Sequence, residues 1–337
     1  MDFRPTSDQQ ALRATARRFL AARFPRDRLR RTVDADAAAG ADDRLDRGLW
    51  RALGEAGFFS LRLPEKEGGA GLGMPEAVLV FEEAGRALVP GPMAATHVAA
   101  GLVPGAADGA AVVTALDGPG VVEHLASADA VLLTGGPTVH VLPAGRGPRP
   151  APDLPTTVPL RPLDPTTPLH RIPGPLPGDA GQRLTGTDAQ QLRLHATLLT
   201  AAQQLGSAAR TLDMAVEHAR NRKQFGRPIG AFQAVQHVCS RMLARTDLAR
   251  SGVYAASVTM TVSEVSAAKL LADEAAVRNA RDCLQLHGGM GFSWEADVHL
   301  HLKRAWVRRE QWQPPAQAEE LLALALLDDG GIAPRNV

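Results

Sequence analysis

Two short segments in the C-terminal half of the chain combine residue types that can hold a large ligand. The first runs Arg222-Lys223-Gln224-Phe225-Gly226, and the second contains Gln285 followed by His287, Gly288 and Gly289. A guanidinium offers a fixed fork of N–H donors to anionic oxygens, and adjacent glycines allow close approach to the backbone. Taken singly, Arg222 also fits a solvated helix-end charge, and the glycine pair fits a helix C-cap.

Cysteine and histidine side chains gather around the second segment, where a metal ion could bind. Cys283 and His287 are four residues apart and therefore share one helical face, and His299 and His301 follow. A zinc site would need further ligands at a compatible geometry. We therefore expect no metal at these residues.

The composition limits the classes of function that are open to the chain. It has 337 residues, 45% of them hydrophobic, and a formal net charge of +1, which argues against nucleic acid as the main partner. Cys239 and Cys283 are expected to be two buried thiols in a reducing compartment. The first residues lack the pattern of a secretion signal, and no apolar run is long enough to span a membrane. We expect a cytoplasmic protein.

The elements that must position these segments fall into three predicted domains. Residues 1–98 are predicted to be helical, because apolar residues such as Leu12, Phe19 and Leu20 recur at helical spacing. A helix over about 75–88 would carry Pro75 in its first turn, where proline is tolerated.

The second predicted domain, residues 99–185, has a different composition. Val112-Val113, Val121-Val122 and Ala130-Val131-Leu132-Leu133 are short apolar runs that predict strands of a small sheet. Thirteen of the 25 prolines lie between Pro137 and Pro177. Proline lacks the N–H that a sheet or helix needs, so this half is expected to be irregular and the domain reduced.

Helical spacing returns in the third predicted domain, residues 186–337. Helices are expected over about 198–219, from about Ala231 to beyond Leu248, from a Ser263 cap toward Leu286, and over about 316–327. Helices joined by short links favour a four-helix bundle.

Three segments together resemble the acyl-CoA dehydrogenase family, over the N-terminal and C-terminal thirds of the chain. They are Leu49-Trp50-Arg51-Ala52-Leu53-Gly54-Glu55-Ala56-Gly57-Phe58 with Leu63 to Gly73, Arg222 to Gly230 with Phe232-Gln233 and Gln236-His237, and Gln285 to Glu295. The resemblance implies a mainly α fold with a helical N-terminal domain, a small β-domain and a C-terminal four-helix bundle. It also implies that FAD accepts hydride from the β-carbon of an acyl-CoA after a carboxylate takes the α-proton.

By this resemblance, the second and third segments bind the FAD of a neighbouring subunit. Arg222 would meet the pyrophosphate and Phe225 would pack on the cofactor. Gln233 and Gln285 would hydrogen-bond it, Gly288 and Gly289 would let backbone approach it, and Gln224 is a further candidate. Arg304, Arg308 and Arg309 are expected on a solvated face or at a partner contact, in preference to a coenzyme A phosphate site.

The catalytic carboxylate of the resembling family has no clear counterpart. Counting from Phe292 to the family's usual position reaches Trp312, and an alternative position reaches Ala196. Glu310 is close in sequence, but two residues displace a side chain too far for proton transfer. The middle domain also lacks the family's Thr-Glu-Pro-x-Ala-Gly-Ser-like strand at the flavin ring; Thr156-Thr157 and Thr166-Thr167 do not match it.

These gaps predict a chain that completes the FAD site of a paralogous subunit, which brings the base. The chain resembles the shortened subunits of actinobacterial heterotetrameric acyl-CoA dehydrogenases that act on steroid side-chain CoA thioesters. An electron-transfer flavoprotein is that family's usual acceptor. Two alternatives stay open: a homomeric flavoenzyme that acts on a carrier-bound acyl group with Glu310 as base, and a non-catalytic scaffold.

Overall fold

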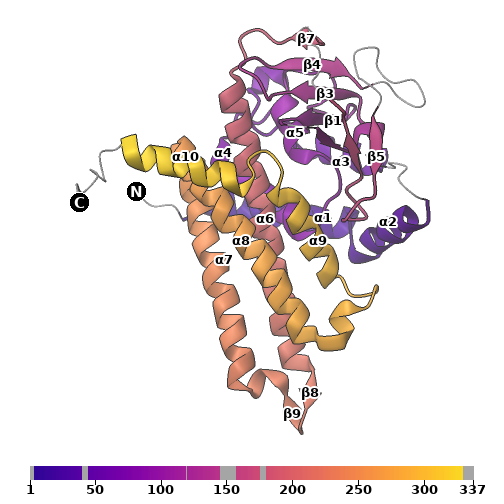
Figure 1. Ribbon diagram of the computed structural model, residues 1–337, viewed down its shortest axis with the longest axis vertical. Helices are drawn as coiled ribbons and strands as arrows, with labels where there is room; N and C mark the ends of the chain where they lie inside the picture. Colours follow the sequence, from indigo (N-terminus) through magenta and orange to yellow (C-terminus); the bar gives the residue numbers. More distant parts are fainter. Residues whose placement is uncertain (1–3, 40–44, 119, 145–156, 175–179, 329–337) are drawn as a thin grey trace.

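The structure is a computed structural model that describes residues 4–39, 45–118, 120–144, 157–174 and 180–328. Helices and a small β-region form one end of the molecule, and long helices extend from there to a hairpin at the other end (Figure 1). This confirms the predicted mainly α fold. None of the described helices is both long and apolar enough to cross a bilayer.

The N-terminal part of the chain is helical, as the apolar spacing predicted. It comprises α1 (Ser7–Arg23), α2 (Arg26–Ala39), α3 (Arg47–Glu55), α4 (Met74–Arg86) and α5 (Met93–Ala99). Thr6 and Gln9 form a capping box at the start of α1, which satisfies N–H groups that the helix itself cannot. Pro75 stands in the first turn of α4 as expected, and Leu20 of α1 is buried in the core.

The middle part forms two small sheets. The first has the order β1 (Val113–Leu116), β3 (Ala130–Leu133), β4 (His140–Pro143) and β7 (Gln182–Arg183), and only β1 and β3 run parallel. The second has the order β2 (Val121–Glu123), β6 (Leu169–Arg171) and β5 (Val158–Leu160), all antiparallel.

The expectation that the proline-rich half holds no regular sheet was wrong. Strands β4, β5 and β6 all lie between Pro137 and Pro177. Pro143 is the last residue of β4, beyond the two residues that pair with β7. Pro159 lies in β5, which is an edge strand, so its missing N–H removes no ladder hydrogen bond on the open side. Thr156 lies outside the described residues.

The C-terminal part is built on long antiparallel helices. It comprises α6 (Ala189–Asn221), the hairpin strands β8 (Lys223–Gln224) and β9 (Arg227–Pro228), α7 (Gln233–Thr259), α8 (Val262–His287), α9 (Val298–Arg309) and α10 (Pro315–Asp328). Ser263 does not cap α8, because Thr261 holds that position and accepts from the Glu264 N–H. The thiol of Cys283 is buried, but Cys239 on α7 is only half-buried, contrary to expectation.

Helix α4 crosses α6 at unusually close range, through a glycine on each helix. A Cβ at Gly206 would stand 1.8 Å from the carbonyl oxygen of Glu82, and one at Gly85 would stand 2.0 Å from that of Gln203. No larger residue fits at either position without moving the backbone. This crossing anchors the upper half of α6 against the N-terminal helices.

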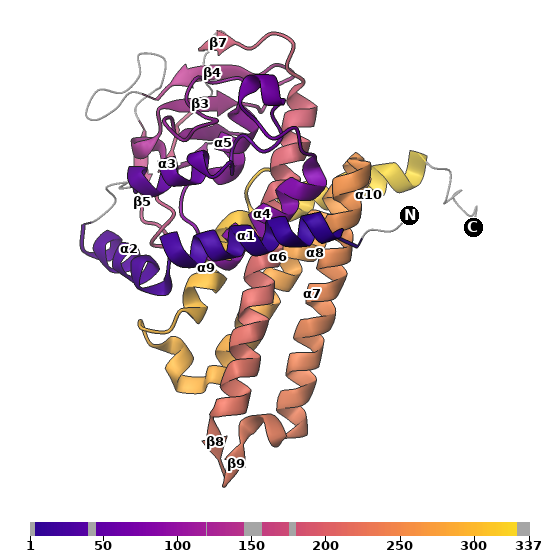
Figure 2. The ribbon, with the colours of Figure 1, turned by 180° about the vertical axis from the view of Figure 1, so that it is seen from behind.

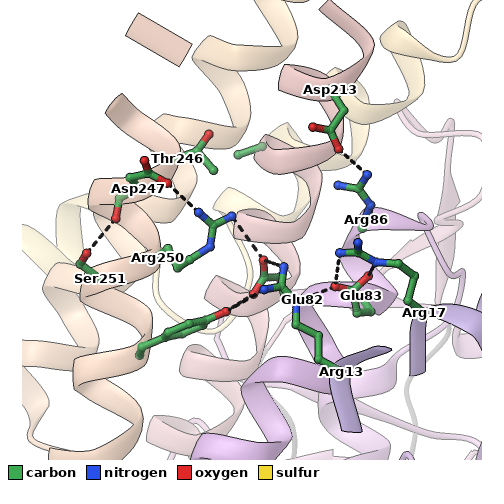
Figure 3. Close-up of polar contacts among 12 residues, drawn as sticks. Arg13, Arg17, Glu82, Glu83, Arg86, Asp213, Thr246, Asp247, Arg250 and Ser251 are labelled. Carbon is green, nitrogen blue, oxygen red and sulfur yellow. Dashed lines mark hydrogen bonds and ion pairs between the residues drawn. The ribbon is translucent and has the colours of Figure 1, made fainter. Parts of the chain in front are cut away.

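A buried polar cluster joins α1 and α7 to the same crossing (Figure 3). Glu82 and Glu83 of α4 have side chains only 1% exposed. Arg13 donates to both carboxylates at 2.7 and 2.8 Å, and Arg17 donates to Glu83 at 2.7 Å. The Tyr254 hydroxyl of α7 donates to Glu82 at 2.7 Å. Each buried carboxylate therefore has charged or hydroxyl donors, as its burial requires.

Candidate functional site

The hairpin between α6 and α7 stands at the far end of the long helices from the two sheets (Figure 2). Strands β8 and β9 pair Lys223 with Pro228 and Gln224 with Arg227. Only Phe225 and Gly226 lie between the paired residues, with φ of 52° and 76°. Two successive positive φ angles are the signature of a type I′ turn, which Asn-Gly normally supplies. A phenylalanine at this position is strained.

The expected ligand-binding side chains of this hairpin face solvent. The ring of Phe225 is 89% exposed, and among the described residues its aromatic neighbour is the Phe232 ring, which it meets edge-on at 6.1 Å. Arg222 follows the last residue of α6, and its main-chain N–H donates to His218. The side chains of Arg222, Gln224 and Gln233 are exposed and make no hydrogen bond or ion pair within the described part of the chain. These polar groups are free for an external ligand.

The glycines after α8 are at the same end of the bundle. Gly288 is the C-cap of α8, with φ 60° and ψ −140°, which agrees with its simpler interpretation as a helix end. Gly289 has no positive φ, and a Cβ there would meet no atom within 4 Å. Neither backbone conformation nor packing within this chain requires glycine at Gly289. Close approach of an external ligand to the main chain would explain a glycine at this position.

Two stacked histidines connect the end of α6 to the end of α8, and the first of them was not among the predicted residues. His218 of α6 stacks on His287 of α8 with ring centroids 4.1 Å apart. Burial lowers the pKa of His218, and the neighbouring His287 and Arg222 lower it further. The stacked pair thus places Arg222 near the end of α8. The exposed Gln285 side chain lies on that last turn.

Glu310, the weak candidate for the catalytic base, is not at this end of the molecule. Glu310 follows the last residue of α9, where Lys269 donates to the carbonyl oxygens of Arg308 and Arg309, both at 3.2 Å. Lys269 stands 18 residues before His287 on α8, or about 27 Å along the helix axis. Glu310 itself is exposed. The structure therefore does not bring it together with the hairpin.

Trp312 stands at the sequence position where the acyl-CoA dehydrogenase family usually has its catalytic carboxylate. Trp312 is buried at 8% exposure and has a φ of 61°. Between α5, α6 and α9 it leaves a cavity of only about 10 Å³, which Thr200 and Gln203 also line. That volume is about one water molecule. Ala196, the alternative position, is fully buried and has no titratable group.

The expectation that the arginines of α9 form a solvated face was wrong for two of the three. Arg304 and Arg308 are 3% exposed, and only Arg309 is exposed. Arg304 donates to the carboxylate of Asp164 and the hydroxyl of Thr166, and to a main-chain oxygen of α4's exit at 3.1 Å. Burial would raise the pKa of Asp164, but Arg304 holds it below its usual value. This ion pair ties the middle part to the bundle.

The cysteine and histidines do not converge as metal ligands. Cys283 Sγ lies 3.7 Å from His287 Nδ1, but that nitrogen is only 2.8 Å from the Cys283 carbonyl oxygen. His299 contacts a main-chain oxygen, and buried His301 contacts the Ser207 hydroxyl at 2.8 Å. Across the described residues, no three His, Cys, Asp or Glu side chains are grouped to hold a metal ion.

Comparison with known proteins establishes the family. Residues 6–110 match the model of the acyl-CoA dehydrogenase N-terminal domain, and residues 186–310 match that of the C-terminal domain. The acyl-CoA dehydrogenase IpdE2 of Mycobacterium tuberculosis is 36% identical over 275 residues, which are 80% of this chain and 83% of IpdE2. The chain belongs to the acyl-CoA dehydrogenase family. Acyl-CoA dehydrogenase FadE34 of the same organism is 33% identical over 86% of this chain and 45% of FadE34.

Solved structures share the whole fold. A chain of the ChsE4–ChsE5 complex of Mycobacterium tuberculosis superposes with a TM-score of 0.80 at 26% identity, over 99% of this chain and 100% of that one. A chain of a Tcur3481–Tcur3483 steroid acyl-CoA dehydrogenase variant also gives a TM-score of 0.80, at 23% identity over 96% and 99%. Family membership supports an oxidoreductase role.

Proposed function

We propose that this chain is a subunit of an FAD-dependent acyl-CoA dehydrogenase that completes the FAD site of a paralogous partner subunit. The observation that carries the proposal is the set of exposed and uncommitted side chains around the hairpin, with a strained, 89% exposed Phe225 at its tip. In a single chain, an exposed ring on a strained turn does not contribute to the stability of the fold. A second chain could cover it.

The residues at this end of the bundle fit FAD in their chemistry. The free guanidinium of Arg222 suits the pyrophosphate, and the ring of Phe225 suits an aromatic surface of the cofactor. Gln224, Gln233 and Gln285 can each donate and accept through their amides. Gly288 and Gly289 leave open space where a Cβ would stand, so main chain can approach the ligand.

The partner subunit would supply the carboxylate that takes the substrate's α-proton. Bound FAD would accept the hydride from the β-carbon. In this chain, Trp312 fills one expected position of the base, and Ala196 has no titratable group at the other. The cavity between α5, α6 and α9 is too small for an acyl chain. This chain's own share of the reaction is then to bind and orient the cofactor.

The relatives support a proposal for the substrate class and the further partners. One similar structure is described as a steroid acyl-CoA dehydrogenase, and the ChsE4–ChsE5 structure is a complex of two named chains. We therefore propose a steroid side-chain CoA thioester as substrate, a heterotetramer as assembly and an electron-transfer flavoprotein as acceptor. The domain limits 1–98, 99–185 and 186–337 stay predictions, as does a cytoplasmic location.

Co-expression tests the proposal directly. The chain is produced alone and together with a paralogue from an adjacent gene, and bound flavin and mass are measured for each. We expect flavin only in the mixed complex, at about one FAD per heterodimer, half the content of a homotetramer. Stoichiometric flavin in the lone chain would favour the homomeric alternative, and a complex whose flavin is unchanged by this chain would favour the scaffold.

A further inference from the structure

A different cavity lies at the opposite end of α6 from the hairpin. It has a volume of about 280 Å³ and opens between the exit of α3, helix α5 and the first turns of α6. Its lining includes Arg62, Leu63, His97, Leu102, Asp188 and His195. Three of these six side chains are basic and one is acidic. The proposed FAD site uses none of them.

Arg62 is a half-buried cation without a counter-ion. No carboxylate of the described residues lies within ion-pair distance of its guanidinium. Its Nη1 and Nη2 lie 3.2 and 3.3 Å from Nδ1 and Nε2 of His195. The two ring nitrogens point in divergent directions, so one guanidinium cannot hydrogen-bond both in the ring plane. Arg62 therefore keeps N–H donors available to the cavity.

The two histidines beside Arg62 are held neutral. Burial lowers the pKa of His195 to about 4, and the charge of Arg62 contributes in the same direction. Burial also lowers the pKa of His97 to about 4. His97 Nδ1 donates to the Phe58 carbonyl oxygen at 2.9 Å, so its Nε2 carries the lone pair in the neutral ring. Both rings can take up a proton if a negative charge enters the cavity.

Nearby carboxylates are directed elsewhere. The side chain of Asp188 caps α6 by accepting from the main-chain N–H of Gln190 at 2.9 Å and of Gln191 at 3.3 Å. Glu67, close to Gly101 near the cavity wall, is exposed and lies 3.8 Å from Lys66. Neither pairs with Arg62. The cavity thus presents a guanidinium with no ion-pair partner among the described residues, an arrangement that costs stability unless an anion fills the cavity.

We propose that this cavity is a binding site for a small oxyanion, a carboxylate or a phosphate group, held by Arg62 and His195. The guanidinium would donate in its own plane, and His195 would gain a proton as the anion binds. Proton uptake couples the two equilibria, so the anion binds more tightly as the pH falls. This proposal does not depend on FAD binding at the hairpin, because the cavity and the hairpin lie at opposite ends of α6.

Titration of the full chain with sulfate is the first test. Binding is measured by calorimetry and by the NMR signals of the histidines. Sulfate keeps its charge between about pH 6 and about pH 7.5, so any pH dependence of its binding belongs to the protein. We expect Arg62→Gln to weaken binding by about tenfold or more, as for loss of a charged hydrogen-bond pair. Arg51→Gln, an exposed arginine on α3, is the matched control and should bind as the wild type does.

Three further measurements make the test decisive. Without sulfate, Arg62→Gln should raise the melting temperature, because burial lowers the pKa of Arg62 and so disfavours its charged form in the folded chain. His195→Gln should bind with a reduced pH dependence. If acetate displaces sulfate, the natural ligand is a carboxylate. If coenzyme A displaces sulfate, the natural ligand is a nucleotide phosphate. Absence of binding, or equal binding by Arg62→Gln, would overturn the proposal.

Discussion

Replacing Phe225 by asparagine should separate the needs of the folded chain from those of the proposed FAD site. Phe225 and Gly226 occupy a type I′ turn with φ of 52° and 76°. A left-handed conformation costs an ordinary residue roughly 1–2 kcal/mol, and asparagine tolerates it best after glycine. The lone chain should therefore prefer asparagine at this position.

The size of the effect on folding follows from the exposure of the ring. At 89% exposure, Phe225 buries little apolar surface, and its edge contact with Phe232 at 6.1 Å is worth about 0.5 kcal/mol. Removing the strain and this contact together should stabilise the lone chain by about 0.5–1 kcal/mol. For a chain of this size that is a rise in melting temperature of roughly 1–2 °C.

The effect on the complex should have the opposite sign and be larger. Covering a phenylalanine ring completely contributes about 1.5–3 kcal/mol, so its loss should weaken retention of flavin roughly 10- to 150-fold. Phe225→Tyr keeps both the ring and the strain and serves as the matched control.

Two assays together check the prediction. Thermal unfolding of the lone chain reports the strain, and flavin retained on dilution of the mixed complex reports the contact. A lower melting temperature for Phe225→Asn would show that the turn is not strained. Unchanged flavin retention would show that the ring does not contact the cofactor or the chain that holds it.

Four other substitutions test separate parts of the structure. Gly206→Ala should lower the free energy of unfolding by about 1–3 kcal/mol, because its Cβ would stand 1.8 Å from a carbonyl oxygen, whereas Gly289→Ala should leave the melting temperature of the lone chain unchanged. Burial would raise the pKa of Glu83, but donors such as Arg17 hold it below its usual 4.5. Glu83→Gln removes this favourable interaction and should therefore destabilise the chain by about 2–3 kcal/mol at neutral pH, as measured by urea unfolding. That difference should shrink as the pH falls below 4.5, because the wild-type carboxylate loses its advantage on protonation. Glu310→Gln should leave turnover of the mixed complex unchanged, and a large loss of turnover would restore Glu310 as a base.

Local sequence patterns predicted the elements that lie close together in the chain. The apolar repeat of α6, the strands at Val113 and Ala130, and Pro75 in the first turn of α4 all depend on neighbouring residues, and the structure contains them. The exposure of Phe225 also agrees with a residue kept for an external contact.

Features set by distant residues could not be predicted in this way. Arg304 is buried because Asp164, 140 positions away, neutralises it, and no local pattern reveals that pairing. Strand β5 tolerates Pro159 because the strand is at a sheet edge, which only the complete topology decides. The cavity around Arg62 similarly depends on His195, which is remote in sequence.

Helix α6 connects its crossing with α4, at Gly85 and Gly206, to the hairpin at its C-terminal end. From Gly206 to Arg222 the helix extends about 24 Å, so a tilt of about 5° at the crossing would displace the hairpin by about 2 Å. A displacement of that size exceeds the tolerance of a hydrogen bond. Substitutions beside Gly85 and Gly206 would then misalign Arg222 with its proposed ligand while leaving every residue at the hairpin unchanged. The close crossing of α4 and α6 would then control the position of the hairpin, although the two lie far apart.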